Sequence, residues 1–217
     1  MDHEFWHERW SKKEIGFHEG SVNKFLYDHW PELSGGGTEG VFVPLCGKAH
    51  DMWWLHDRGH PVIGVELSEI ACKDFFAEAG EKAMVHPGEP FTTFRHENLE
   101  LWAGDFFQLV PDDLKDIRLV YDRAALIALP APMRKAYVEH ITAIIPDGTR
   151  ILLITLDYKT RISPPPFNVS DDEVRELYSA DYDIEHILTN TLPNDHMFTK
   201  RKGLIGATES VFRLTKR

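Results

Sequence analysis

The stretch VFVPLCGKAHDMWWLHDRGHPVIGVELS, residues 41–68, decides the fold. Its apolar run over 41–43 predicts a buried strand, and Gly47 marks a tight turn after it. A helix is expected over roughly 48–57 and a second strand over 62–65. Two strands joined through a helix form a βαβ unit, so the sheet is expected to be parallel at this point.

Glu66 follows the second of these strands directly. An acid at the carboxyl end of the second strand of a βαβ unit can accept hydrogen bonds from two ribose hydroxyls, while the first turn holds the other end of the ligand. We therefore predict a site for a nucleoside-bearing cofactor with Glu66 at the ribose. The alternative is a solvated acid at a strand end.

The turn at residues 44–48, PLCGK, limits the choice of ligand. It contains neither the GxGxxG pattern of dinucleotide sites nor the GxxxxGK[ST] pattern of nucleoside triphosphate sites. A nucleoside ending in a small zwitterion fits better, because turn amides and a helix N-terminus can hold it, as they would the amino acid part of S-adenosylmethionine. A buried turn that needs Gly47 only for its backbone remains equally open.

Further segments extend the α/β pattern outward from this unit. Apolar runs predict strands, Met133 begins a helical segment, and Ser170 opens a capping-box pattern. The expected strands are 100–103, 117–121 and 151–156, the helix spans 133–144, and 182–214 forms two or three antiparallel strands at the sheet edge. Because strands and helices alternate, we expect a mainly parallel sheet.

The first 35 residues are expected to be helical, and the whole chain, 1–217, to form one domain. Ser21 is the expected cap of the second helix, and Pro31 with the glycine triplet at 35–37 is expected to close this segment. Its aromatic side chains, Trp6, Trp10 and Phe17, suit either a buried core or a lid that excludes water from a cleft.

Composition excludes several partners. The net charge is −11, with 35 acidic residues against 24 basic ones, which argues against nucleic acid. The two cysteines form no disulfide framework, and no segment approaches the ~20 apolar residues of a membrane span. We expect a cytoplasmic protein with reduced thiols, and a monomer.

Arg123 follows the predicted strand 117–121, again at the carboxyl edge where ligands gather. It is expected to face the cleft and to contact the cofactor or an anionic substrate. The alternative is an internal ion pair between Asp122 and Arg123. Asp105 and Phe106, after the strand at 100–103, are weaker candidates for residues near an adenine.

The remaining motifs give weaker indications of function. The segment His3 to His7 matches HExxH, but it lies among the first few residues and lacks a third ligand, so we expect no metal. The other histidines, including His56, show no ligand spacing. Cys46 has no identifiable base beside it, and Pro164-Pro165-Pro166 reads as a rigid loop. No catalytic residue in the nucleophilic or acid–base sense is expected.

Three segments together resemble one family. FWHERWSKKEIGFHEGSVN at 5–23, the stretch at 41–68 and VYDRAALIAL at 120–129 are similar to the bacterial thiopurine S-methyltransferases. The resemblance implies a class I S-adenosylmethionine-dependent methyltransferase fold, Rossmann-like, with a seven-stranded mostly parallel sheet and helices on both faces. By position it implies cofactor contacts for Trp10, Leu45, Glu66 and Arg123, an acceptor pocket bordered by Phe17, and a substrate-facing arginine for which Arg201 is the candidate.

The resemblance further implies transfer of a methyl group from S-adenosylmethionine to the sulfur of aromatic or heterocyclic thiols such as thiopurines. Bacterial members are associated with selenium and tellurium compounds as well. A nucleoside-binding regulatory module without turnover is the competing hypothesis. An NAD-dependent oxidoreductase is disfavoured because the glycine-rich fingerprint is missing.

Overall fold

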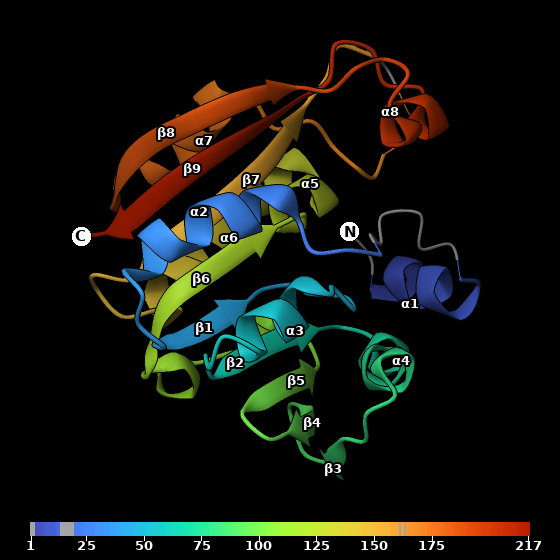
Figure 1. The fold of residues 1–217 in the computed structure, drawn as a ribbon, viewed down its shortest axis with the longest axis vertical. Coiled ribbons are helices and arrows are strands. Elements are labelled where there is room, and N and C mark those ends of the chain that lie inside the picture. Colours follow the sequence, from blue (N-terminus) through green and yellow to red (C-terminus); the bar gives the residue numbers. More distant parts are fainter. Residues whose placement is uncertain (1–2, 14–19, 161, 163) are drawn as a thin grey trace.

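The computed structural model describes residues 3–13, 20–160, 162 and 164–217. They form one twisted sheet with helices on both faces (Figure 1). The sheet has nine strands in the order β3-β4-β5-β2-β1-β6-β7-β9-β8. The strands are β1 (Gly40–Val43), β2 (Val62–Glu66), β3 (Met84–His86), β4 (Thr92–His96), β5 (Leu99–Ala103), β6 (Ile117–Arg123), β7 (Arg150–Asp157), β8 (Tyr182–Thr191) and β9 (Thr208–Lys216).

The centre of the sheet is parallel, as the sequence predicted. Strands β5, β2, β1, β6 and β7 pair in parallel, whereas at one edge β9 pairs antiparallel with β7 and β8 pairs antiparallel with β9. The expected sheet of seven strands is therefore present, but the count is corrected to nine, because the hairpin β3–β4 extends the opposite edge antiparallel to β5. The sequence analysis did not predict these two strands, because β3 is wholly exposed and β4 is mostly polar.

The described helices are distributed over both faces of the sheet. Side chains of α2, α3 and α4 pack on one face, and those of α5, α6 and α7 pack on the other. The helices are α1 (His3–Ser11), α2 (Lys24–Ser34), α3 (Asp51–His56), α4 (Glu69–Ala79), α5 (Ala125–Ala128), α6 (Ala131–Ile144), α7 (Asp171–Tyr178) and α8 (Met197–Lys202), with short 3-10 turns at Phe106–Gln108 and Pro111–Leu114.

Alternation along the central strands creates two separate cores. In β1, Val41 and Val43 face the core under α2, α3 and α4, whereas Phe42 faces the core under α5, α6 and α7. The same alternation divides Leu152 from Leu153 in β7. Because side chains of a strand point to opposite faces in turn, a sheet covered on both sides reads as a continuous apolar run.

Helix boundaries follow local capping, with two corrections. Asn23, and not Ser21, caps α2, because its side-chain oxygen accepts hydrogen bonds from the amides of Phe25 and Leu26. Pro31 lies inside α2, which continues until Gly35 ends it in a left-handed conformation. The predicted cap at Ser170 is confirmed, since its hydroxyl accepts from the amide of Glu173.

Helix α3 is shorter than predicted, since it begins at Asp51 after a turn over 47–50.

Within the part of the chain that the structure describes, no helix is both long and apolar enough to span a membrane.

Candidate active site

A cavity of about 860 Å³ lies at the carboxyl edge of the parallel strands. It is the place where an open α/β sheet binds its ligands. Residues at the ends of five neighbouring strands line it, and α1, α2, α5, α6, α8 and the adjoining ends of β8 and β9 supply the remaining walls. The strand-end residues are Leu45, Glu66, Gly104, Arg123 and Leu156, and the helices add Trp6, Trp10, Ile127, Met133, Phe198 and Arg201.

The turn after β1 has an unusual backbone. Leu45 adopts a positive φ of 46° although it is not glycine, and Gly47 follows with a φ of 54°. A non-glycine residue in this region costs on the order of 1–3 kcal/mol and persists only where its surroundings fix it. Here the amide of Cys46 donates to the carbonyl of Val65 at 2.9 Å. The turn is thus held against β2.

Gly47 is required for a second reason. A β-carbon at this position would lie 3.3 Å from the indole ring of Trp10. Trp10 is 3% exposed, so α1 is anchored by an aromatic side chain laid directly on the turn. This contact places the N-terminal helix at the rim of the cavity.

Glu66 is the point where three segments meet. Its Oε2 accepts from the amide of Gly47 at 3.0 Å, and its Oε1 accepts from the amide of Ser68 at 2.9 Å. The Trp10 side chain, whose only donor is the indole N–H, also donates to this carboxylate. Glu66 is 7% exposed, so the solvated-acid alternative is wrong.

The charge of Glu66 is finely balanced. Burial raises the pKa of Glu66 to about 7, even though hydrogen bonds from the Trp10 side chain and from the amides of Gly47, Leu67 and Ser68 favour its charged form. With Leu67, these donors number four, about as many as a carboxylate accepts, so a ligand hydroxyl that donates to Glu66 would share an oxygen with one of them or replace it. A ligand that donates to Glu66 would stabilise its ionised form.

Arg123 lines the cavity from the end of β6. Its Nη1 lies 3.6 Å from Oδ2 of Asp51, a residue that is 2% exposed at the start of α3. Asp51 also accepts from the Tyr121 hydroxyl at 2.9 Å and from the amide of Asn23 at 2.7 Å. This network ties the beginning of α2 to the guanidinium that faces the cavity.

The ion pair between Asp122 and Arg123 considered from sequence is not formed. Asp122 turns to the other face of the sheet, where its Oδ2 accepts from the Tyr137 hydroxyl at 2.7 Å. Successive side chains of a strand point to opposite faces, so one neighbour reaches the cavity network and the other the core.

The floor of the cavity includes Gly104 and the two residues after it. A β-carbon at Gly104 would lie 2.4 Å from the Phe91 ring, so only glycine fits here. The Asp105 carboxylate accepts from the amide of Phe107 at 3.0 Å and lies 3.6 Å from His3 Nε2. Phe106 lines the cavity and is 2% exposed. Both weaker candidates from the sequence therefore lie at the cavity.

The far wall carries basic side chains. Arg201 and Lys202, at the end of α8, line the cavity, and Lys202 Nζ is 3.5 Å from the carbonyl of Pro165. Partial burial lowers the pKa of Lys202, and the neighbouring cations Arg201 and Arg9 lower it further. The Pro-rich loop, α8 and α1 therefore converge on this wall.

The structure brings together four of the five predicted site residues. Trp10, Leu45, Glu66 and Arg123 all line the one cavity, whereas Phe17 falls outside the described residues. Sequence reasoning missed much of the wall formed by the end of β8, the start of β9 and the connection between them, namely Asn190, Thr191, Pro193, His196, Met197 and Glu209. No local signal marks these residues, because their position depends on how a long connection folds back over the sheet.

Sequence comparison identifies relatives of this chain. The family model described as thiopurine S-methyltransferase matches residues 1–217. A thiopurine S-methyltransferase of Marinobacter nauticus is 72% identical over 219 residues, with 100% of both chains covered. Another, of Azotobacter vinelandii, is 44% identical over 218 residues and again covers 100% of both chains.

Solved structures share the fold at low sequence identity. A Burkholderia thailandensis 1,6-didemethyltoxoflavin-N1-methyltransferase with bound S-adenosylhomocysteine superposes with a TM-score of 0.65 at 13% identity, covering 99% of this chain and 87% of the other. An S-adenosylmethionine-dependent methyltransferase from Anabaena variabilis gives 0.61 at 12% identity, covering 99% and 95%. The fold is that of the S-adenosylmethionine-dependent methyltransferases, and the chain belongs to the thiopurine S-methyltransferase family.

Proposed function

We propose that this S-adenosylmethionine-dependent methyltransferase methylates the sulfur of aromatic or heterocyclic thiols such as thiopurines, within the cavity described above. Family membership supports the S-methyl transfer and the methyl donor. The main support for an aromatic or heterocyclic acceptor is the cavity itself. It extends from Glu66 and the turn after β1 to a wall of apolar side chains that basic side chains border. A regulatory module without turnover has no support among the relatives.

The residues fit the donor. Trp10, Leu45, Glu66 and Arg123 are its proposed contacts, and all four line the same cavity. Glu66 presents a buried carboxylate at the cavity, where a ribose hydroxyl can share an oxygen with one of its protein donors or replace that donor. The strained Leu45 turn and Gly104 both bring backbone to the cavity wall, which suits a ligand recognised by main-chain groups.

Bound S-adenosylmethionine supplies a methyl group already activated on a sulfonium, so the chain needs mainly to orient a thiolate and to exclude water. Trp6 and Trp10 of α1 lie at the cavity, and we propose that residues 1–35 form a lid within a single domain, 1–217. A dry site favours a reaction between opposite charges that are neutralised in the transfer.

The acceptor end is proposed to lie between Arg123 and α8. Asp51 orients the Arg123 guanidinium, whose planar donors suit a thiolate or a ring nitrogen. The basic wall of Arg201 and Lys202 favours acceptors that carry negative charge. Phe17 is proposed to border the acceptor on the strength of the family resemblance, and selenium or tellurium compounds are proposed as further acceptors on the same ground.

A matched acceptor panel tests the proposal. The enzyme is incubated with methyl-labelled S-adenosylmethionine and a thiopurine, its oxygen isostere, a benzenethiol and a phenol, and the products are identified by mass spectrometry. S-methylated products should form in proportion to enzyme, with little from the oxygen isosteres. Equal methylation of phenol and thiol, or product from neither thiol, would overturn the acceptor assignment.

We also propose that the enzyme works as a monomer in the cytoplasm without nucleic acid. The charge of −11 is unfavourable for binding a polyanion, and both cysteines are free and buried, as reducing conditions allow. Light scattering during gel filtration tests the monomer directly, since a mass near twice 25.0 kDa would contradict it.

A further inference from the structure

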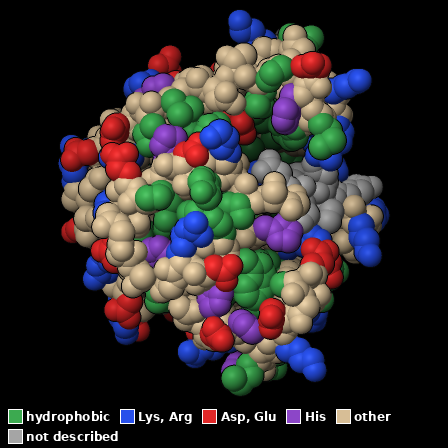
Figure 2. Space-filling view, in the orientation of Figure 1, with side chains coloured by type: hydrophobic (Ala, Val, Ile, Leu, Met, Phe, Trp, Pro, Cys, Tyr) green, Lys and Arg blue, Asp and Glu red, His purple; other side chains and the backbone are tan. Residues whose placement is uncertain are grey.

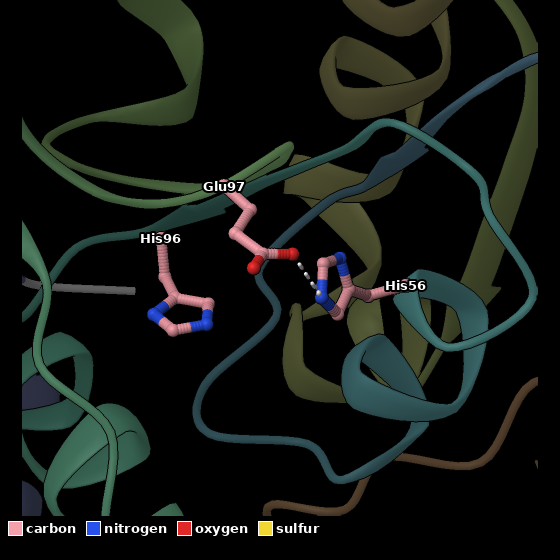
Figure 3. A group of neighbouring side chains, drawn as sticks. All are labelled: His56, His96 and Glu97. Carbon is pink, nitrogen blue, oxygen red and sulfur yellow. Dashed lines mark ion pairs between the residues drawn. The ribbon is translucent and has the colours of Figure 1, made fainter.

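Three potential metal ligands converge at the edge of the sheet opposite the cavity. His56 ends α3, His96 ends β4, and Glu97 begins the turn into β5. One ligand atom from each lies within 4.8 Å of the others. Figure 3 shows both imidazole rings beside the Glu97 carboxylate, from segments that lie far apart in the sequence.

Local contacts hold the ligands in place. Nε2 of His56 lies 3.6 Å from Oε2 of Glu97. Nδ1 of His96 lies 3.3 Å from the carbonyl of Lys82 and 3.7 Å from Oε2 of Glu81, so Nε2 is the nitrogen left for a cation. The Trp53 ring packs edge-on against both imidazoles, with centroid separations of 5.8 Å to His56 and 5.6 Å to His96.

We propose that His56, His96 and Glu97 form a site for a divalent transition cation of the zinc type. Two imidazoles and a carboxylate are a ligand set that zinc accepts, and its donor atoms lie about 3.3 Å apart when bonds are about 2.0–2.1 Å. The separation of 3.6 Å between His56 and Glu97 is already close to this value. The Glu97 side chain is 73% exposed, so it can adjust, and water can complete the coordination.

Support from the second coordination sphere is uneven. Nδ1 of His56 is buried and has no hydrogen-bond partner among the residues that the structure describes, whereas His96 has the Lys82 carbonyl. A ligating histidine is oriented by the partner of its other nitrogen. His96 is therefore the better oriented ligand of the two.

The location separates this site from methyl transfer. His96 pairs with Leu99 at the start of β5, while the cavity lies beyond Ala103 at its end. In the space-filling view, histidine and acidic side chains lie side by side at the surface over α3 and β4 (Figure 2). A bound cation would clamp α3 to the hairpin β3–β4 and would act on stability.

Calorimetry with zinc alone tests the site. The protein, freed of metal with a chelator that is then removed, is titrated with ZnCl2 and compared with His96→Gln and Glu97→Gln. His86→Gln, on β3 at the far end of the same hairpin, is the matched control, and His7→Gln tests the HExxH segment. Because Glu97 is exposed, its variant is expected to fold normally.

The wild type should bind one Zn²⁺ per chain and melt at a higher temperature with zinc than without. Loss of an outer-sphere partner costs about 10- to 100-fold in metal affinity, so each ligand variant should bind about 100-fold more weakly or worse, while both controls bind normally. Wild-type affinity no better than that of His96→Gln, or binding abolished by His7→Gln instead, would overturn the proposal.

Discussion

The ends of β2 and β6 carry two buried carboxyl groups that look alike and serve different purposes. Glu66 and Asp122 are 7% and 1% exposed, and burial raises the pKa of each to about 7. Glu66 lines the cavity and accepts from two backbone amides and Trp10. Asp122 faces the core, with one oxygen bonded to Tyr137 and the other buried without a partner among the described residues.

The difference shows that a displaced pKa does not by itself identify a functional group. Both displacements have the same leading cause, which is loss of solvent. Glu66 differs from Asp122 in two ways: it lies at the cavity, and it accepts more hydrogen bonds. Both favour a carboxylate that binds a ligand. The same acid turned to the other face becomes a structural group.

The largest effect is expected on stability, from Asp122→Asn. A pKa raised from 3.8 to about 7 corresponds to about 4 kcal/mol for a fully buried carboxyl. The folded state holds the proton more tightly than the unfolded state, so Asp122 costs stability as pH rises from about 4 to about 7. The variant should therefore gain up to about 4 kcal/mol relative to wild type between about pH 4 and pH 8.

Urea unfolding across this pH range measures the gain, with exposed Asp195→Asn as the matched control. An equal gain in the control, or none in Asp122→Asn, would show that the core carboxyl does not titrate as described.

The next largest effect is expected on ligand binding, from Glu66→Gln. The substitution removes the charge that accepts from two amides and Trp10, and hydrogen bonds to charged groups contribute about 1.5–3 kcal/mol. S-Adenosylmethionine should bind about 100-fold more weakly in calorimetry at about pH 8, whereas Asp122→Asn should bind within about twofold of wild type. Equal losses in the two variants would abolish the distinction between these strand ends.

A smaller effect is expected from pH on the wild-type enzyme. If ribose hydroxyls donate to ionised Glu66, whose pKa is about 7, affinity for S-adenosylmethionine should fall about tenfold from pH 8 to pH 6. Asp122→Asn should keep this profile and Glu66→Gln should flatten it. A wild-type affinity that is level over this range would show that the ionised form is not the one that binds.

The smallest effect is expected from Trp10→Phe. Phenylalanine keeps an aromatic ring on Gly47 but cannot donate to Glu66. Because Glu66 keeps its backbone donors, S-adenosylmethionine affinity should fall by only part of the value of that bond, about fivefold or about 1 kcal/mol. Trp54→Phe, in α3 and not among the residues that line the cavity, serves as the matched variant. A similar loss there would show that the indole contact with Glu66 is not the cause.

Much of this site was predictable from sequence because the ends of β strands determine where its residues lie. Leu45, Glu66 and Arg123 follow strands that apolar runs reveal, and parallel strands bring their carboxyl ends to one edge. Trp10 needed the family resemblance, since an aromatic residue on a short helix fits a core as well as a lid. Asp122 shared the sequence signature of a strand-end acid, and only the alternation of side chains separated it from Glu66.

The remaining parts depended on long-range packing. The wall from α8 requires the connection between β8 and β9 to fold over the cavity, which no local pattern encodes. Likewise His56 meets His96 and Glu97 only because α3 lies against the hairpin β3–β4. The hairpin itself was missed, since its exposed strand has no apolar run.

The central claim is that Glu66 and the Leu45 turn form the nucleoside end of the methyl-donor site. A crystal structure of the wild-type protein with S-adenosylhomocysteine tests it most directly. We expect a ribose hydroxyl within hydrogen-bonding distance of the Glu66 carboxylate and the amino acid end at the turn after β1. A ribose bound elsewhere, with Glu66 contacting only Gly47, Ser68 and Trp10, would contradict the assignment.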